Sequence, residues 1–114
     1  VILESDLDIA FKEFRRVYVS DAIIDYIYDI VKETRLDDRV ILGASPRAGE
    51  HLLYAAMAKA YLNDRDYVIP DDVKELAIPV LSHRIIVKPE YEAEGINGRN
   101  IVRDVLDRVE VPTG

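Results

Sequence analysis

Three stretches of this sequence repeat their apolar residues every three or four positions, and each opens with a residue that starts helices. Serine before a helix caps the free N–H groups of its first turn, and proline at the first helical position loses no hydrogen bond. Apolar residues at this spacing line one face of a helix. The pattern predicts three helices: from Ser20 to about Arg35, from Ser45 to about Leu62, and from Pro70 onward with a kink or break at Pro79.

Weaker patterns fill the rest of the chain. A last helix is expected over roughly Gly98 to Val109, and a short one near Ser5 to Arg16. Short apolar pieces between the helices indicate extended connectors: "VYVS", "RVILG", "DYVIP" and the residues Ile85 to Val87. With 114 residues, the chain is expected to form one domain. The predicted fold class is mainly α, a four- to five-helix bundle with short extended connectors.

Composition excludes several classes of function. The formal charge is −7 and the pI about 4.8, which argues against general binding to nucleic acid or to an anionic membrane. There is no cysteine, and no apolar run is long enough to span a membrane, so a cytoplasmic location is expected. The first residue is Val1 rather than methionine, which indicates a fragment of a longer protein.

Catalytic and metal-binding patterns are missing from the sequence. It has neither a G-x-x-x-x-G-K-[ST] phosphate loop nor a G-x-G-x-x-G turn. His51 and His83 are far apart, and neither has the spacing of a metal ligand, so no metal site is predicted. Nothing resembles a nucleophile with its base. The isolated chain is therefore not expected to be an enzyme.

Arg47 stands out because it occupies the first turn of a predicted helix, where the helix dipole favours acidic side chains. One interpretation is an exposed arginine that pairs with a carboxylate such as Glu50, and spacing alone favours it. The other is an anion site, in which the guanidinium and the free N–H groups of the first turn grip a phosphate. Spacing does not decide between them.

Five motifs occur in order over most of the chain from about Val17 onward. They are Thr34-Arg35 at a helix end, Gly43 to Ala48 ("GASPRA"), Arg65 to Val68 ("RDYV"), Pro70 to Val73 ("PDDV") and Val80 to Arg84 ("VLSHR"). Each motif is weak by itself, whereas the ordered set is specific. Together they resemble the C-terminal lid of MoxR-type AAA+ ATPases, and the closing "VEVP" also fits that family.

The resemblance implies that Arg47 is the sensor-2 residue, which reaches the γ-phosphate of ATP from the lid, and that Ser45 and Pro46 shape the turn that presents it. It also implies a large ATPase subdomain that holds ATP and Mg²⁺, a ring that is usually hexameric, and client proteins with von Willebrand factor A domains. Residues 1–17 would then connect to the large subdomain, and residues 18–114 would form the lid. No nucleotide is expected to bind this fragment firmly by itself.

Two residues depart from the family pattern. Asp64 stands where glycine is usual, and Ile69 stands where a hydroxyl residue often caps the next helix. A docking surface for the large subdomain is expected near "RVILGASP", with Ile41 and Leu42 exposed. The alternatives are a free-standing helical adaptor that binds a protein through an apolar groove, and a histone-fold-like dimer suggested by "VIPDDVKELA".

Overall fold

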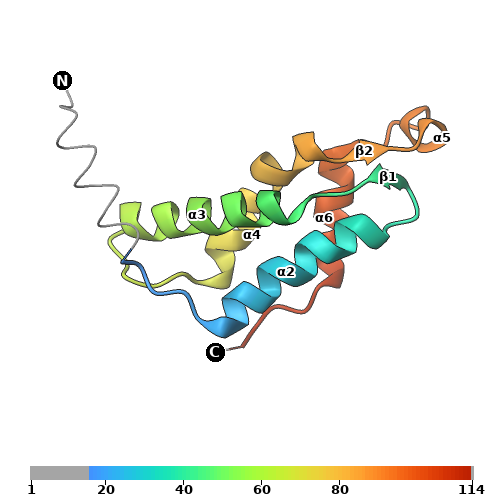
Figure 1. The fold of residues 1–114 in the computed structure, drawn as a ribbon. Helices are drawn as coiled ribbons and strands as arrows, with labels where there is room; N and C mark the ends of the chain where they lie inside the picture. Colours follow the sequence, from blue (N-terminus) through green and yellow to red (C-terminus); the bar gives the residue numbers. More distant parts are fainter. Residues whose placement is uncertain (1–15, 114) are drawn as a thin grey trace, which may run out of the picture.

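A computed structural model describes residues 16–113 of the chain, so the short helix expected near Ser5 to Arg16 lies almost wholly outside the described residues. The described part is mainly helical, as predicted, with two short strands (Figure 1). Its elements are α2 (Asp21–Leu36), β1 (Val40–Leu42), α3 (Pro46–Leu62), α4 (Pro70–Leu81), a 3₁₀ turn η1 (Ser82–Arg84), β2 (Ile86–Val87), α5 (Pro89–Glu92) and α6 (Gly98–Arg108).

Four helices make the bundle. Helices α2 and α4 each contact both α3 and α6 (Figure 1). Gly49 lets α2 and α3 approach closely, because a Cβ atom at this position would lie 3.3 Å from Cγ2 of Val31. The core between the helices is aliphatic; its fully buried members include Ile30, Leu52, Ala56, Val73, Leu81, Ile101 and Val105.

Serine caps begin two of the helices, as the sequence predicts. The Ser20 hydroxyl accepts a hydrogen bond from the Ile23 N–H, and the Ser45 hydroxyl accepts one from the Ala48 N–H, both at 3.2 Å. Each bond satisfies one N–H group that the first turn leaves without a partner. The predicted ends of α2 and α3 agree with the structure to within one residue.

Of the predicted kink or break at Pro79, the break is wrong, because α4 continues through Pro79 to Leu81. Proline removes the N–H that would bind the carbonyl of Glu75, and both residues are exposed, so water can satisfy that carbonyl. The Ser82 N–H still makes an α-helical bond to the Ile78 carbonyl, and the chain continues directly into the 3₁₀ turn η1. The proline therefore lies close to the end of the helix without setting it.

The extended connectors pair with one another, which the sequence did not show. β1 and β2 form a two-stranded antiparallel sheet, with Leu42 opposite Ile86. At the other end of α3, Tyr18 and Tyr67 form a parallel bridge, closed by a 2.8 Å bond from the Tyr18 N–H to the Asp66 carbonyl. The single-turn helix α5 was also not predicted, since its region has no helical repeat.

The link between α3 and α4 is fixed by an ion pair. The Arg65 guanidinium makes two 2.7 Å hydrogen bonds to the carboxylate of Asp72, whose side chain is 2% exposed. Burial acts to raise the pKa of Asp72, but the bonds from Arg65 and from the Ile69 N–H outweigh it, so the pKa is lowered. Asp72 also accepts a 3.0 Å hydrogen bond from the Ile69 N–H, and Ile69 itself makes no side-chain cap. Asp64, which stands where the family usually has glycine, adopts a left-handed conformation with φ 60°.

Candidate functional site

Arg47 lies in the first turn of α3 with its side chain exposed. It forms no ion pair with Glu50 or with any other carboxylate among residues 16–113. Ser45 caps the helix and Pro46 is its first residue, as predicted. The three predicted site residues therefore lie together at one end of α3, and the interpretation of Arg47 as a partner of Glu50 finds no support in the described part of the chain.

A buried threonine holds the turn that leads to Arg47. The Thr34 hydroxyl, in the last turns of α2, accepts a 3.0 Å hydrogen bond from the Ala44 N–H and donates a 2.6 Å bond to the Val31 carbonyl. Thr34 and Ala44 are both 0% exposed. Because water does not reach this place, the hydroxyl is the group that satisfies the Ala44 N–H, and it fixes the turn to α2.

Gly43 brings the same turn into direct contact with the end of α2. A Cβ atom at Gly43 would lie 2.6 Å from Cα of Arg35, a distance that no side chain tolerates. The motif at the end of α2 and the motif before α3 are thus two sides of one junction. Sequence reasoning placed Ser45, Pro46 and Arg47 but gave no role to Thr34, because a threonine in the last turns of a helix has no distinctive periodicity.

A charged network anchors the start of β1. The Asp37 carboxylate accepts bonds of 2.9 and 2.8 Å from Nε and Nη2 of Arg39, and Arg39 Nη1 reaches Asp104 on α6 at 2.9 Å. The Asp37 side chain is 4% exposed. The hydrogen bonds from Arg39, with help from Arg108, lower the pKa of Asp37 to about 2, although burial acts to raise it. The network holds the end of α2 against α6.

Arg84 contacts α3 one turn beyond Arg47. Its Nη2 atom lies 2.9 Å from Nδ1 of His51, and its Nη1 atom donates to the carbonyl of Val80. His83, its neighbour, is exposed. In the described part of the chain, no group of three or more His, Asp or Glu side chains is arranged to hold a metal ion.

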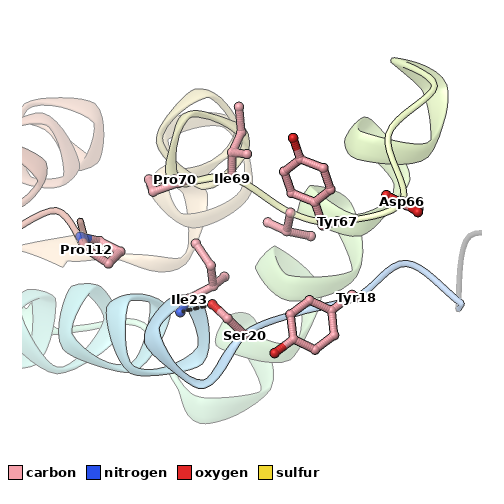
Figure 2. A pocket seen from close by; sticks show the side chains of 9 residues that line it. Tyr18, Ser20, Ile23, Asp66, Tyr67, Ile69, Pro70 and Pro112 are labelled. Atoms are coloured by element: carbon pink, nitrogen blue, oxygen red, sulfur yellow. Dashed lines mark hydrogen bonds between the residues drawn. The ribbon is translucent and has the colours of Figure 1, made fainter. Parts of the chain in front are cut away.

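Two open grooves border α3. The first, of about 210 Å³, lies between α2 and α3 and is lined by apolar side chains that include Ile24, Tyr28 and Leu53, with Pro46 at its edge. The second, of about 480 Å³, lies beyond the opposite end of α3, between Tyr18, Tyr67 and Pro112 (Figure 2). Since α3 has 17 residues, about 25 Å separates its two ends, and the second groove contains none of the predicted site residues.

Exposed aliphatic side chains gather where they were expected. Ile41 is 60% exposed and Leu42 is 57% exposed, and Ile86 on the partner strand is 51% exposed. The predicted exposure of Ile41 and Leu42 is confirmed, and their role as a docking surface stays a prediction. No helix in residues 16–113 has the length and hydropathy that crossing a membrane requires.

Comparison with known proteins shows which family this helical fold belongs to. The family model of the AAA lid domain matches residues 32–105, so the chain belongs to the AAA lid domain family. This span contains the Thr34 junction, Arg47 and most of α6. The relatives narrow the class: this is the lid domain of a MoxR-like AAA+ protein. The histone-like alternative is thereby wrong.

Three relatives illustrate the match. The chain is 44% identical over 112 residues to the protein YeaC of Bacillus subtilis, and the match covers 98% of this chain and 35% of YeaC. It is 35% identical over 104 residues to the chaperone MoxR1 of Mycobacterium tuberculosis, covering 83% of this chain and 28% of MoxR1. A crystal structure of a proposed ATPase from Cytophaga hutchinsonii superposes with a TM-score of 0.85 at 38% identity, covering 90% of this chain and 34% of the other. The chain thus spans about a third of the length of these relatives.

Proposed function

We propose that Arg47 is the sensor-2 arginine of a MoxR-like AAA+ ATPase and that it contacts the γ-phosphate of ATP. One observation carries this proposal: an exposed arginine, with no carboxylate partner among residues 16–113, sits on a turn that a buried hydrogen bond fixes in place. The planar guanidinium matches two phosphate oxygens at once. Ser45 and Pro46 hold the turn in the geometry that aims Arg47 outward.

The remaining parts of the nucleotide site lie on a large subdomain outside this chain. That subdomain supplies the phosphate loop and the ligands of Mg²⁺, since the described residues contain no cluster that could hold the metal. Arg47 stabilises the charge that builds on the γ-phosphate during transfer. Because it is carried on the lid, the closure of the lid depends on whether that phosphate is present.

The exposed aliphatic residues Ile41 and Leu42 form the docking surface for the large subdomain in this proposal. The whole protein assembles as a ring, hexameric by resemblance to its family, and couples ATP hydrolysis to remodelling of client proteins, among them proteins with von Willebrand factor A domains. The chaperone MoxR1 and the proposed ATPase of Cytophaga hutchinsonii support this class of activity through their similarity. Matches that span about a third of each relative favour a lid over a free-standing adaptor.

The test uses the intact ATPase that contains this lid. Arg47→Ala is expected to lower turnover at least tenfold while leaving the melting temperature almost unchanged, because an exposed first-turn arginine contributes little to stability. Arg47→Lys keeps the charge without the bidentate fork and should recover only part of the activity. Arg103→Ala is the matched control, since Arg103 is also exposed and lies on α6 without an ion pair among residues 16–113. Hydrolysis by Arg47→Ala at the rate of this control contradicts the assignment.

A further inference from the structure

We infer that Arg84 is a second cation of the same polyphosphate site and that His51 holds its guanidinium in place. The inference rests on the proposed role of Arg47 and extends it to a residue from a different part of the chain. It assigns a role to the motif from Val80 to Arg84, which the sensor proposal leaves without one.

The two-stranded sheet explains why Arg84 lies near the turn of Arg47. In the antiparallel pairing, Leu42 is opposite Ile86. The chain runs forward from Leu42 into Gly43 and α3, and it arrives at Ile86 from Arg84 (Figure 1). Because the strands are antiparallel, both segments leave the sheet at the same end. Two cations that are 37 positions apart in sequence are thus delivered to the same end of α3.

The guanidinium of Arg84 is oriented but not neutralised. Nη1 donates to the carbonyl of Val80, and Nη2 lies 2.9 Å from Nδ1 of His51. Arginine has no acceptor, so Nδ1 of His51 accepts this bond and the imidazole proton is on Nε2. Both partners are neutral groups. Within residues 16–113, these bonds use two of the five N–H donors, which leaves three for a ligand.

Arg47 and Arg84 lie within reach of one ligand. His51 follows Arg47 by four positions on α3, so the two side chains share a helix face with Cβ atoms about 6 Å apart. Arg84 is anchored to the distal member of this pair. An arginine side chain spans more than that separation, and consecutive phosphate groups of one nucleotide can therefore contact both guanidinium groups.

There are 22 acidic residues against 15 lysines and arginines, so carboxylates are in excess. Arg39, Arg65 and Arg108, which join elements of the fold, each pair with a carboxylate. Within residues 16–113, neither Arg47 nor Arg84 does so. Several other arginines of residues 16–113, among them Arg35, Arg99 and Arg103, also lack an ion pair, but Arg84 differs from them because hydrogen bonds to uncharged groups hold its guanidinium. A positive charge that is fixed in position and left uncompensated fits a polyanionic ligand.

The experiment measures the affinity of the intact ATPase for fluorescent ATP and fluorescent AMP. Arg84→Ala should weaken ATP binding about tenfold, the equivalent of about 1.4 kcal/mol, and should change AMP binding less than twofold, because AMP lacks the outer phosphates. Arg84→Lys should recover part of the loss. Arg84→Gln retains a donor for His51 without the charge and should behave as Arg84→Ala. Arg103→Ala again controls for the loss of one exposed positive charge.

The outcomes separate this inference from the sensor proposal. ATP affinity of Arg84→Ala equal to that of Arg103→Ala overturns the inference, and so does an equal loss for ATP and AMP or full recovery by Arg84→Gln. Arg47→Ala, assayed for hydrolysis in parallel, reports on the sensor proposal independently; both proposals fail if Arg47→Ala and Arg84→Ala match the control. Where the alanine variant melts well below the parent protein, the Gln and Lys variants decide in its place.

Discussion

Replacing Thr34 by valine tests whether the turn that presents Arg47 depends on a single buried hydrogen bond. Valine has nearly the shape of threonine, so the packing around α2 is preserved. The substitution removes the hydroxyl, which accepts a 3.0 Å hydrogen bond from the Ala44 N–H. That N–H group is then left buried without this partner. The Val31 carbonyl loses a 2.6 Å bond but remains inside α2, where the helix supplies its own donor.

The expected loss of stability comes mainly from the Ala44 N–H, because the Val31 carbonyl keeps a donor within the helix. An unsatisfied buried donor costs about 1–3 kcal/mol, so Thr34→Val should lower the free energy of unfolding by about 2 kcal/mol. For a domain of this size, that corresponds to a fall in melting temperature of roughly 10 °C. Urea unfolding of the chain, followed by circular dichroism, measures the free energy directly, provided that the slope with denaturant stays constant.

Hydrogen exchange at the Ala44 amide gives the decisive readout. Thr34→Ser keeps both hydrogen bonds and loses one buried methyl group, at a cost of about 1 kcal/mol. The Ala44 amide should stay protected in the serine variant and exchange quickly in the valine variant. The increase should exceed what the change in global stability accounts for. If Thr34→Val unfolds at the same urea concentration as the parent chain and its Ala44 amide stays protected, the hydroxyl does not hold the turn.

Three further substitutions test other parts of the fold. Gly98→Ala should lower the free energy of unfolding by more than about 2 kcal/mol in urea titration, because the new Cβ atom would lie 2.1 Å from the carbonyl oxygen of Ser82; an unchanged midpoint contradicts that close contact. Asp64→Gly should raise stability by about 0.5–1 kcal/mol by relieving the φ of 60°, and a loss of stability would show that the aspartate side chain contributes more than its backbone costs. The pKa of Asp37 is lowered from 3.8 to about 2, chiefly by hydrogen bonds from Arg39. About 2 kcal/mol of folding stability should therefore be present above pH 4 and be lost as the pH falls through 2. Asp37→Asn should flatten this part of the profile of stability against pH, and an unchanged profile would exclude the effect.

Local signals were enough to predict the four helices of the bundle and where they start, although not the single-turn helix α5. Ser20 and Ser45 cap helices because their side chains act on N–H groups two or three residues ahead, an effect that sequence spacing alone specifies. The left-handed conformation of Asp64 follows in the same way from the few residue types that tolerate it. These interactions span at most one helical turn, so they can be predicted without knowledge of the tertiary contacts.

Contacts between distant segments were beyond the sequence patterns. The sequence patterns did not pair Asp72 with Arg65, seven positions earlier, yet Asp72 is buried against it. The continuation of α4 past Pro79 likewise depends on which side of the helix faces water. The candidate site divides in the same way: local spacing placed Ser45 and Pro46 at the start of α3, and the family resemblance singled out Arg47, whereas Thr34 and Arg84 are linked to this end of α3 through partners 10 and 33 positions away.

Arg47 lowers the stability of the start of α3, and no ion pair among the described residues compensates for this. A cation in the first turn of a helix opposes the dipole by about 0.3–1 kcal/mol, and no carboxylate among residues 16–113 offsets that cost by pairing with it. The turn itself is held by the Thr34 hydroxyl, the Ser45 cap and the close contact of Gly43 with α2, none of which involves the arginine. The fold therefore tolerates Arg47 without depending on it. An anion at the end of α3 would interact favourably with the helix dipole and with the positive charges of Arg47 and Arg84, so binding of a polyphosphate is expected to stabilise this end of the lid.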